Sequence, residues 1–516
     1  MVKTLTLKHF LITFLVFWSM TLWAEQHFFD VAQLNLAVGG ALLVCFFPIH
    51  LSKQQKIALW LCYAIITMLT FFISAKFWAP WLFTALVITA IGFNWRHIPA
   101  NVYALLLVFV AAFFNLSFIT NTHIGDVQYD FASCYNYIEY IMENDFKFWQ
   151  ENPLLTRPSY STYHPILHFF LAATAIRFGE FFGFTKDVAS EAAQIWFVFY
   201  MMWYGIICAK ILAMFTTDKR IYLPCLAVVV FFPTYRAITG FFNNDCLLLA
   251  LQAGVIYYSL CYYQNGGKRN LFYIFLFATL ACLTKLSGIL VLPFTAVAFL
   301  LRMKKYTNKQ TFLEVLGFGL LILAGISLWP LYQHFILHVG LSYVPPQQHL
   351  SLESYNLWER FSPLGAFLYE KMFYNDFGIN LWETMTKTAL FGQWDFTLRG
   401  ALIMPIITLM VWTYKILIAG VIGAIFYLGF KAKNKVLFGL CLVLLISLIS
   451  GQIAFVLTHP FMCNQDFRYV AVLPLIFMMI MAQFLVQSPP MVQRIAVSLL
   501  ILFSFLAAFI WQWVSV

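Results

Sequence analysis

Long apolar runs separated by short polar stretches make up most of the chain. Runs long enough, or nearly long enough, to cross a bilayer lie at roughly 9–24, 31–49, 57–75, 78–94, 100–120, 192–215, 221–240, 246–263, 271–284, 286–301, 311–329, 401–429, 436–457, 469–486 and 495–513. A transmembrane helix needs about 20 consecutive, predominantly apolar residues. The pattern therefore predicts an all-α, polytopic transmembrane bundle of about fifteen helices.

The composition agrees with a membrane location. Of the 516 residues, 62% are hydrophobic and only 10% are charged, whereas soluble domains carry about 25% charged residues. The net charge of +10 raises the question of nucleic acid binding, but the basic residues stand in small clusters between apolar runs. Loops that face anionic lipid headgroups explain this arrangement better, so we expect no nucleic acid partner.

Lysine and arginine recur in every second loop, which predicts an orientation. Starting with Lys3 and Lys8 on one side, these loops hold Lys53, Lys56, Arg96, Lys219, Arg220, Lys268, Arg269, Arg302, Lys304, Lys305, Lys309, Lys431, Lys433, Lys435 and Arg494. Among the acidic residues, only Asp218 and Glu314 share that side. Cytoplasmic loops are enriched in Lys and Arg. We therefore expect a multi-pass protein of the inner (plasma) membrane, with a cytoplasmic N-terminus and an acidic periplasmic side.

This alternation holds only if the segment 164–183 does not cross the membrane. The segment carries His164, His168, Arg177 and Glu180, which suits a helix that lies along the outer interface. The chain then divides into N-terminal spans, a first outer loop, a transmembrane core, a second outer loop and C-terminal spans, at 1–120, 121–191, 192–329, 330–400 and 401–516.

Two acidic residues follow directly after the predicted span at 100–120. Asp126 and Asp130 are four residues apart, so in a helix their carboxylates would share one face at the membrane boundary. A carboxylate there can accept a proton from a hydroxyl group or coordinate a cation. The alternative is a solvated helix cap, because Asp is common where helices begin.

A second acidic position lies in an outer turn between two later spans. Asn244 and Asp245 stand there, and a turn followed by an N-cap would explain both of them. Lys285 stands at another outer turn, against the bias of basic residues toward the cytoplasm. Binding a phosphate would explain it, and the alternative is a side chain that snorkels to the lipid headgroups.

A second basic position opens a late span from the outer side. Arg468 and Tyr469 lie beside Asp466. Arg grips phosphate oxygens with two parallel hydrogen bonds, whereas the alternative is an ion pair with Asp466. We expect Lys285 and Arg468 to approach one another at the outer end of the bundle, because one anionic ligand would account for both cations.

Taken together, these residues resemble the membrane glycosyltransferases of GT-C fold, in the branch of dolichyl-phosphate-mannose protein mannosyltransferases and bacterial aminoarabinose transferases. The resemblance covers about residues 110–485. It rests on Asp126 with Tyr129 and Asp130, on Tyr163-His164-Pro165-Ile166-Leu167, on Asn244-Asp245, on Thr284-Lys285-Leu286-Ser287-Gly288 with Pro293, and on Arg468-Tyr469 before Leu473-Pro474. Four additional predicted spans precede the first of these motifs, where that family usually has one helix.

The resemblance implies transfer of a hexose or pentose from a polyprenyl-phosphate-linked donor to a glycan, lipid or protein acceptor at the outer face. Asp126 would act as the general base on the acceptor, with Asp130 beside it. A divalent cation occurs in this superfamily, although no ligand set in the sequence requires a metal. The remaining implied contacts are those with the donor phosphate, from Lys285, Arg468 and Tyr469, and those with the rest of the substrate, from His164, Asn244 and Asp245.

Other functions remain open at this point. A polysaccharide polymerase or ligase would have similar helix numbers and large outer loops, and would rely more on Arg and His residues in those loops. A lipid or solute transporter would place ionisable groups near the middle of the membrane, where Lys415 is a candidate. A non-catalytic scaffold would tolerate loss of every residue named above.

Overall fold

The computed structural model describes residues 81, 84, 100–122, 131–147, 161–240, 242–305, 309–340, 350–364, 378–392 and 403–514. The predicted spans at 9–24, 31–49 and 57–75 lie outside these residues, as does all of 78–94 except Trp81 and Thr84. Later predicted spans coincide with a helix or with two consecutive helices. The described helices are α5 (Ala100–Asn121), α6 (Phe131–Glu143), α8 (Leu167–Phe181), α9 (Lys186–Ala193), α10 (Ile195–Leu212), α11 (Lys219–Val230), α12 (Pro233–Thr239), α13 (Asp245–Asn265), α14 (Lys268–Thr284), η2 (Leu286–Val291), α15 (Leu292–Lys305), α16 (Lys309–Phe335), α17 (Leu357–Phe361), α18 (Leu381–Phe391), α20 (Met404–Lys431), α21 (Lys435–Thr458), η6 (Met462–Gln465), η7 (Phe467–Val470), α22 (Leu473–Gln487) and α23 (Pro490–Val514).

The described part of the chain is all-helical, and its apolar helices indicate a membrane protein. Within it, 8 helices are long and apolar enough to cross a bilayer, or 9 if the bent pair α11 and α12 forms one span. α16 is the most outward-facing of these, since only 11% of an apolar stretch of 18 residues within it is buried in the protein. Leu320, Leu323 and Leu328 on α16 are more than half exposed. Such a helix needs lipid to cover it.

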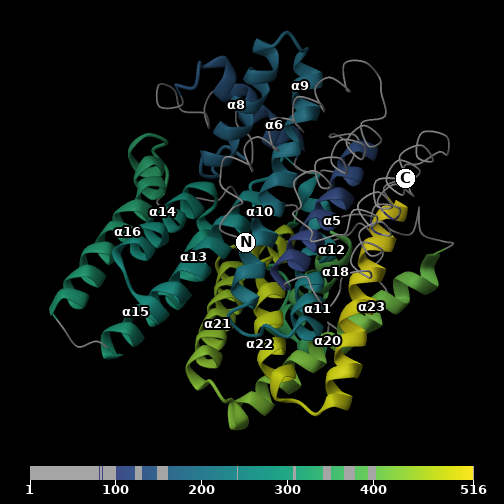
Figure 1. Ribbon diagram of the computed structural model, residues 1–516. Coiled ribbons are helices and arrows are strands. Elements are labelled where there is room, and N and C mark those ends of the chain that lie inside the picture. Colours follow the sequence, from purple (N-terminus) through teal and green to yellow (C-terminus); the bar gives the residue numbers. More distant parts are fainter. Residues whose placement is uncertain are drawn as a thin grey trace, which may run out of the picture.

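The helices form a bundle with a cap at one end (Figure 1). In the bundle, α13 packs between α10 and α14, α10 packs on α5, and α11 packs on α22 and α23. The cap consists of α6, α8 and α9, which lie at the top of the view, and α8 packs against both of the other two. The charge pattern predicts that this end faces outward, and we call it the predicted outer end.

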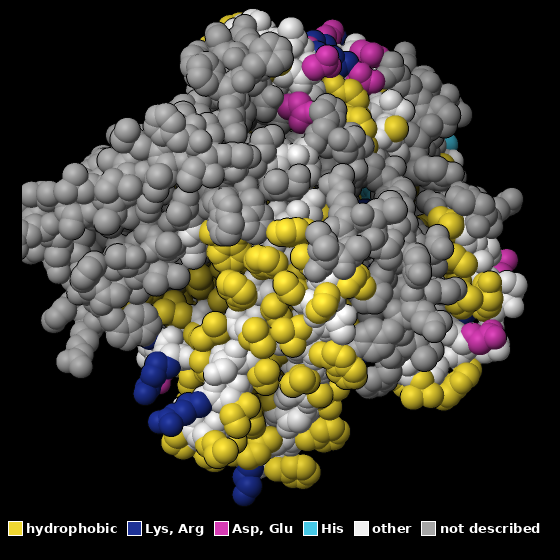
Figure 2. All heavy atoms as spheres, turned by 90° about the vertical axis from the view of Figure 1, so that its right-hand side faces the viewer, with side chains coloured by type: hydrophobic (Ala, Val, Ile, Leu, Met, Phe, Trp, Pro, Cys, Tyr) yellow, Lys and Arg dark blue, Asp and Glu magenta, His cyan; other side chains and the backbone are white. Residues whose placement is uncertain are grey.

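The surface shows the polarity that the sequence predicts. On the face seen in Figure 2, a broad band of apolar side chains covers the middle of the protein. Lys and Arg side chains lie along the lower edge of that band, and a group of Asp and Glu lies at the opposite end, where Lys and Arg are interspersed. The orientation in a membrane remains a prediction from these charges.

Helix α8 occupies most of the segment that we expect to lie along the membrane surface. It has 15 residues, which is about 22 Å of helix and too short to cross a hydrocarbon core of about 30 Å. Its apolar face packs on α6 and α9 in the cap. Arg177 and Glu180 form an ion pair at its exposed side, and Arg177 also donates to the Met142 carbonyl of α6 at 2.9 Å.

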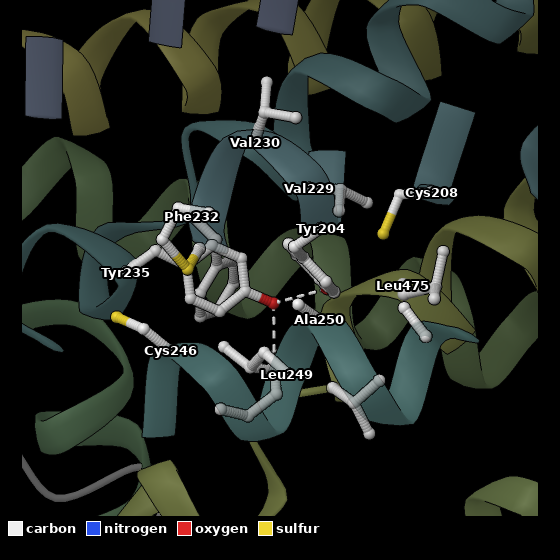
Figure 3. Close-up of a cluster of buried hydrophobic side chains, with 14 of the residues drawn as sticks. Tyr204, Cys208, Val229, Val230, Phe232, Tyr235, Cys246, Leu249, Ala250 and Leu475 are labelled. Carbon is white, nitrogen blue, oxygen red and sulfur yellow. Dashed lines mark hydrogen bonds between the residues drawn. The ribbon is translucent and has the colours of Figure 1, made fainter. Parts of the chain in front are cut away.

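A buried tyrosine pair ties three parts of the bundle together. Tyr204 of α10 and Tyr235 of α12 are hydrogen-bonded through their hydroxyls at 2.9 Å. Tyr235 also donates to the carbonyl of Ala471, which precedes α22, at 2.7 Å. Figure 3 shows both rings inside a cluster of apolar side chains. In such surroundings the hydroxyls need partners, so these bonds fix how α10, α12 and α22 meet.

Candidate site at the predicted outer end of the bundle

The α13–α14 hairpin places an acidic and a basic residue next to one another. Asn243 accepts a hydrogen bond from the backbone N–H of Asp245 at 2.9 Å, which shapes the turn before α13. Asn244 does not cap α13 with its side chain. Its amide instead donates to the Thr284 carbonyl at the end of α14, at 3.0 Å. The alternative of a capping side chain therefore does not account for Asn244: it occupies the N-cap position, but its side chain joins the two helices.

Lys285 follows α14 in a turn that brings its side chain back into the protein. Its backbone is extended, with φ −160° and ψ 140°, which ends the helix. The turn is tight: a Cβ on Gly288 would lie 2.7 Å from the Ala281 carbonyl carbon. Only glycine fits there without displacing the backbone. Contacts between residues that are close in the sequence thus fix the direction of the Lys285 side chain.

Lys285 is paired with Asp245 inside the protein. Its Nζ lies 2.6 Å from Asp245 Oδ1, and the two side chains are 6% and 1% exposed. Lys285 therefore does not snorkel to a surface, which was the alternative to phosphate binding. The other carboxylate oxygen, Asp245 Oδ2, is buried without a hydrogen-bond partner in the described structure. It can accept a hydrogen bond from a ligand.

The second basic residue is held by the segment that leads into α22. Asp466 accepts a hydrogen bond from the backbone N–H of Arg468 at 3.0 Å, which caps η7. The Arg468 side chain forms an ion pair with the same carboxylate, with Nε 3.5 Å from Oδ2. The ion pair with Asp466, which was the alternative to phosphate binding by Arg468, is thus present. The backbone N–H of Phe467 donates to Thr388 of α18 at 2.8 Å, which anchors η7 to the second predicted outer loop.

Tyr469 brings the two cations together. Lys285 Nζ lies 4.5 Å from the centre of its ring, and the Arg468 guanidinium carbon lies 5.7 Å from the same centre. The two positive charges also act on one another. Asp245 and Asp466 balance them, so these four groups together carry no net charge. The approach of Lys285 and Arg468 that we expect from the sequence is therefore present in the structure.

Helix α8 and the segment that leads into it contribute two histidines to the same region. Burial, followed by the charges of Lys285 and Arg468, holds the pKa of His164 well below its usual value. Burial, followed by the charge of Lys285, lowers the pKa of His168 to about 3. Both imidazoles are therefore neutral at pH 7. Neither nitrogen of His168 has a hydrogen-bond partner in the described structure, although the residue is 1% exposed.

Gln333, near the end of α16, is a further polar residue in this region. Its amide donates to the backbone carbonyl of Tyr163 at 3.3 Å, and the Tyr163 ring contacts that of His164. The oxygen of the Gln333 amide is buried without a partner in the described structure. A neutral imidazole both donates and accepts, whereas the amide oxygen and Asp245 Oδ2 only accept. A ligand that satisfies these atoms must carry hydrogen-bond donors, as hydroxyl groups do.

The structure brings some of the predicted site residues together, whereas others lie outside the described residues. Lys285, Arg468, Tyr469, Asp245 and His164 come together, with Asn244 supporting the hairpin. Asp126 and Asp130 lie outside the described residues. No group of three or more metal-ligating His, Cys, Asp or Glu side chains occurs within the described ranges.

Two members of the site were not predicted. His168 had a signal, since it lies four residues after His164 and a helix would place both on one face. No signal in the sequence pointed to Gln333, because its role depends on where α16 ends relative to the cap.

No family model matches the chain, and no curated protein or solved structure matches it either. Function is therefore inferred from the chemistry of the site.

Proposed function

We propose that this protein is a membrane glycosyltransferase that takes its sugar from a polyprenyl-phosphate-linked donor at the outer face of the membrane. The acceptor is a glycan, lipid or protein. Asp126 is the general base, and Lys285 and Arg468 hold the phosphate of the donor. The proposal rests on the residues of the predicted outer end and on the resemblance of their motifs to the GT-C enzymes.

One observation carries the proposal: Lys285 and Arg468 come from distant parts of the chain and meet on the ring of Tyr469. Two nearly buried cations attract a phosphate far more strongly than two exposed ones, because little water screens them. The leaving group of such a reaction is a polyprenyl phosphate. Cations fixed beside its oxygens stabilise the charge that develops as the sugar departs.

The balanced charges of the site also indicate how a donor binds. Lys285 and Arg468 are already paired with Asp245 and Asp466, so an incoming phosphate adds negative charge to a neutral cluster. Each cation must then bridge the phosphate and its own carboxylate. Lys has three donors and Arg has five, which is enough to serve both partners. Asp245 and Asp466 thereby keep the cations in place when no donor is bound.

Two unpartnered acceptor atoms in this region support a sugar as the other half of the ligand. Asp245 Oδ2 and the Gln333 amide oxygen accept hydrogen bonds and have no partner in the described structure. The phosphodiester of the donor cannot satisfy them, since it carries no hydrogen-bond donor. Sugar hydroxyls can.

Transfer by the purified full-length protein in nanodiscs tests the proposal. Radiolabelled undecaprenyl-phosphate hexoses and pentoses are supplied with lipid and glycan acceptors extracted from a deletion strain, and release of undecaprenyl phosphate is measured. We expect release with wild type, and a loss of at least roughly tenfold in kcat/KM for Lys285→Met and for Arg468→Gln, since each removes a charge-assisted hydrogen bond.

Lys415→Met is the matched control. It removes a lysine that also lies against an aromatic ring, that of Trp412, but on α20 and outside the site. It should release undecaprenyl phosphate at the wild-type rate. Absence of transfer from every donor, together with unchanged lipids and glycans in the deletion strain by mass spectrometry, would contradict the proposed function.

A further inference from the structure

Helix α12 is a short, buried helix in a broken span. It is bent by 42° from α11, and all 7 of its residues are buried. Pro233 begins the helix, where its missing N–H costs nothing. Broken helices at membrane depth are tolerated where protein surrounds them, and they often bind ligands. α12 is therefore a place where a ligand-binding side chain is expected.

Arg236 of α12 is such a group. The residue is 2% exposed, and neither Nη1 nor Nη2 has a hydrogen-bond partner in the described structure. No described Asp or Glu forms an ion pair with it. Arg keeps its proton in proteins, so the charge stays when the side chain is buried. A buried cation without a counter-charge is strongly unfavourable.

The surroundings of Arg236 compensate only part of this cost. Its guanidinium carbon lies 4.8 Å from the centre of the Phe114 ring on α5, which is a cation–π contact. The ring lowers the cost of the charge but offers no acceptor to the N–H groups, which lie in the guanidinium plane. They need oxygen atoms beside them.

Packing fixes the helix that carries Arg236. Tyr235 fixes one side of α12 through its bond to Tyr204 (Figure 3) and through its bond to the Ala471 carbonyl. At the end of the helix, a Cβ on Gly240 would lie 2.7 Å from the Phe118 ring. α12 is thus held against α5, with the guanidinium beside Phe114.

We propose that Arg236 binds an oxyanion, the phosphate of a lipid headgroup or a free phosphate, in a site separate from Lys285 and Arg468. The planar fork of donors on Arg matches two oxygens of a phosphate. The charges that act on Lys285 are those of Asp245, Arg468 and Asp466, and Arg236 is not among them. This second site does not depend on the proposed glycosyltransferase activity.

The test measures thermal unfolding of the purified full-length protein in detergent, with four additives compared at equal ionic strength. Sodium phosphate is compared with sodium chloride. Dioleoyl phosphatidic acid is compared with dioleoylglycerol, which differs from it only by the phosphate. We expect a phosphate-bearing additive to raise the Tm of wild type. A rise with phosphatidic acid alone identifies a lipid headgroup, and a rise with inorganic phosphate identifies the free ion.

Three variants check that the effect belongs to Arg236. Arg236→Gln should weaken the titrated affinity at least roughly tenfold. Arg236→Lys keeps the charge but loses the fork, so its affinity should fall between those of wild type and Arg236→Gln. Arg494→Gln removes an exposed arginine near the start of α23 and should bind as wild type does. If Arg236→Gln does not fold, the lysine variant and native mass spectrometry of phosphate adducts on wild type give the same comparison.

Two results would overturn the inference. One is a wild-type Tm that neither phosphate changes, or a change that persists in full in Arg236→Gln. The other is an intrachain counter-charge. Asp126→Asn and Asp130→Asn test for it: if either lowers the Tm of wild type but not of Arg236→Gln, a carboxylate of the chain is the partner.

Discussion

At the residue scale, the site is governed by what burial does to charge. Lys285 and Asp245 are both nearly inaccessible and neutralise each other, whereas His168 is kept uncharged by its surroundings. Charged groups of one sign are not left alone in the cluster, which is the usual condition for burying them. Two predictions belong to this scale.

The first concerns Asp126, the proposed catalytic base. Asp126→Asn keeps the shape of the side chain and removes its basicity, so sugar transfer should fall by about 10²–10⁴-fold. Binding of undecaprenyl phosphate should persist, because the proposed phosphate contacts come from Lys285 and Arg468. Asp130→Asn should cost less, unless both carboxylates share a metal ion, in which case both losses are severe and sensitive to chelators. Transfer by Asp126→Asn at close to the wild-type rate would refute the role of Asp126.

The second concerns acid stability. His168 has a pKa of about 3 in the folded protein, against about 6.5 in an unfolded chain. Above pH 6.5 both states are neutral there, and the full stability is present. As the pH falls from about 6.5 toward 3, the unfolded state binds the proton preferentially and stability is lost. The Tm of His168→Phe should therefore depend less on pH in this window than that of wild type.

His334→Asn provides the comparison for that measurement, because His334 is exposed on α16. Its Tm should follow the wild-type pH dependence. An identical slope for wild type and His168→Phe between pH 4 and 6.5 would show that His168 does not contribute.

At the scale of secondary structure, turns rather than helices decide where the chemistry lies. The helices follow from apolar runs, but the positions of Lys285 and Arg468 depend on η2 and η7, whose backbones are set by Gly288 and by the Asp466 cap. Short irregular segments at helix ends leave polar side chains free to point inward, away from lipid.

A glycine substitution tests this dependence. In Gly288→Ala the new methyl group would meet the Ala281 backbone at 2.7 Å, and the turn must shift. We expect a loss of about 1–3 kcal/mol in stability and weaker binding of undecaprenyl phosphate, because Lys285 moves with the turn. Gly317→Ala on α16 is the control, since nothing lies within 4 Å of its new Cβ. Equal stability and affinity in the two variants would contradict the assigned role of the turn.

At the scale of the whole molecule, the bundle has an apolar belt, a basic end and a cap that contains acidic residues (Figures 1 and 2). The site lies between the bundle and the cap, which is where the proposed reaction would bring a lipid-linked donor in the membrane to an acceptor from outside. This arrangement requires the cap to face outward.

Cysteine labelling in spheroplasts tests that orientation. Ser159→Cys and Ser354→Cys, in a background whose native cysteines are replaced by serine, should react with an impermeant maleimide in intact spheroplasts. Lys304→Cys, at the exposed end of α15, should react only after permeabilisation. If the cysteine at either of the two serine positions is protected in intact spheroplasts, the predicted topology is wrong.

The sequence by itself determined the class of fold, the positions of the described spans and the polarity of the surface. These properties depend on composition or on residues close together in the sequence. A bilayer requires about 20 apolar residues per helix, so each span is visible as a continuous apolar run. The sequence also singled out Lys285 and Arg468, because basic residues on the acidic side are unusual, and Tyr469 because it follows Arg468 in the motif that opens a late span. Asp126 and Asp130 remain predictions, since they lie outside the described residues.

Only the tertiary structure decided which polar residues meet. The Lys285–Asp245 pair spans 40 positions of the sequence, and Gln333 reaches Tyr163 across 170. The burial of Arg236 depends on how α12 packs against α5. Such contacts follow from the way the helices pack in three dimensions, and no local pattern of apolar and polar residues encodes them.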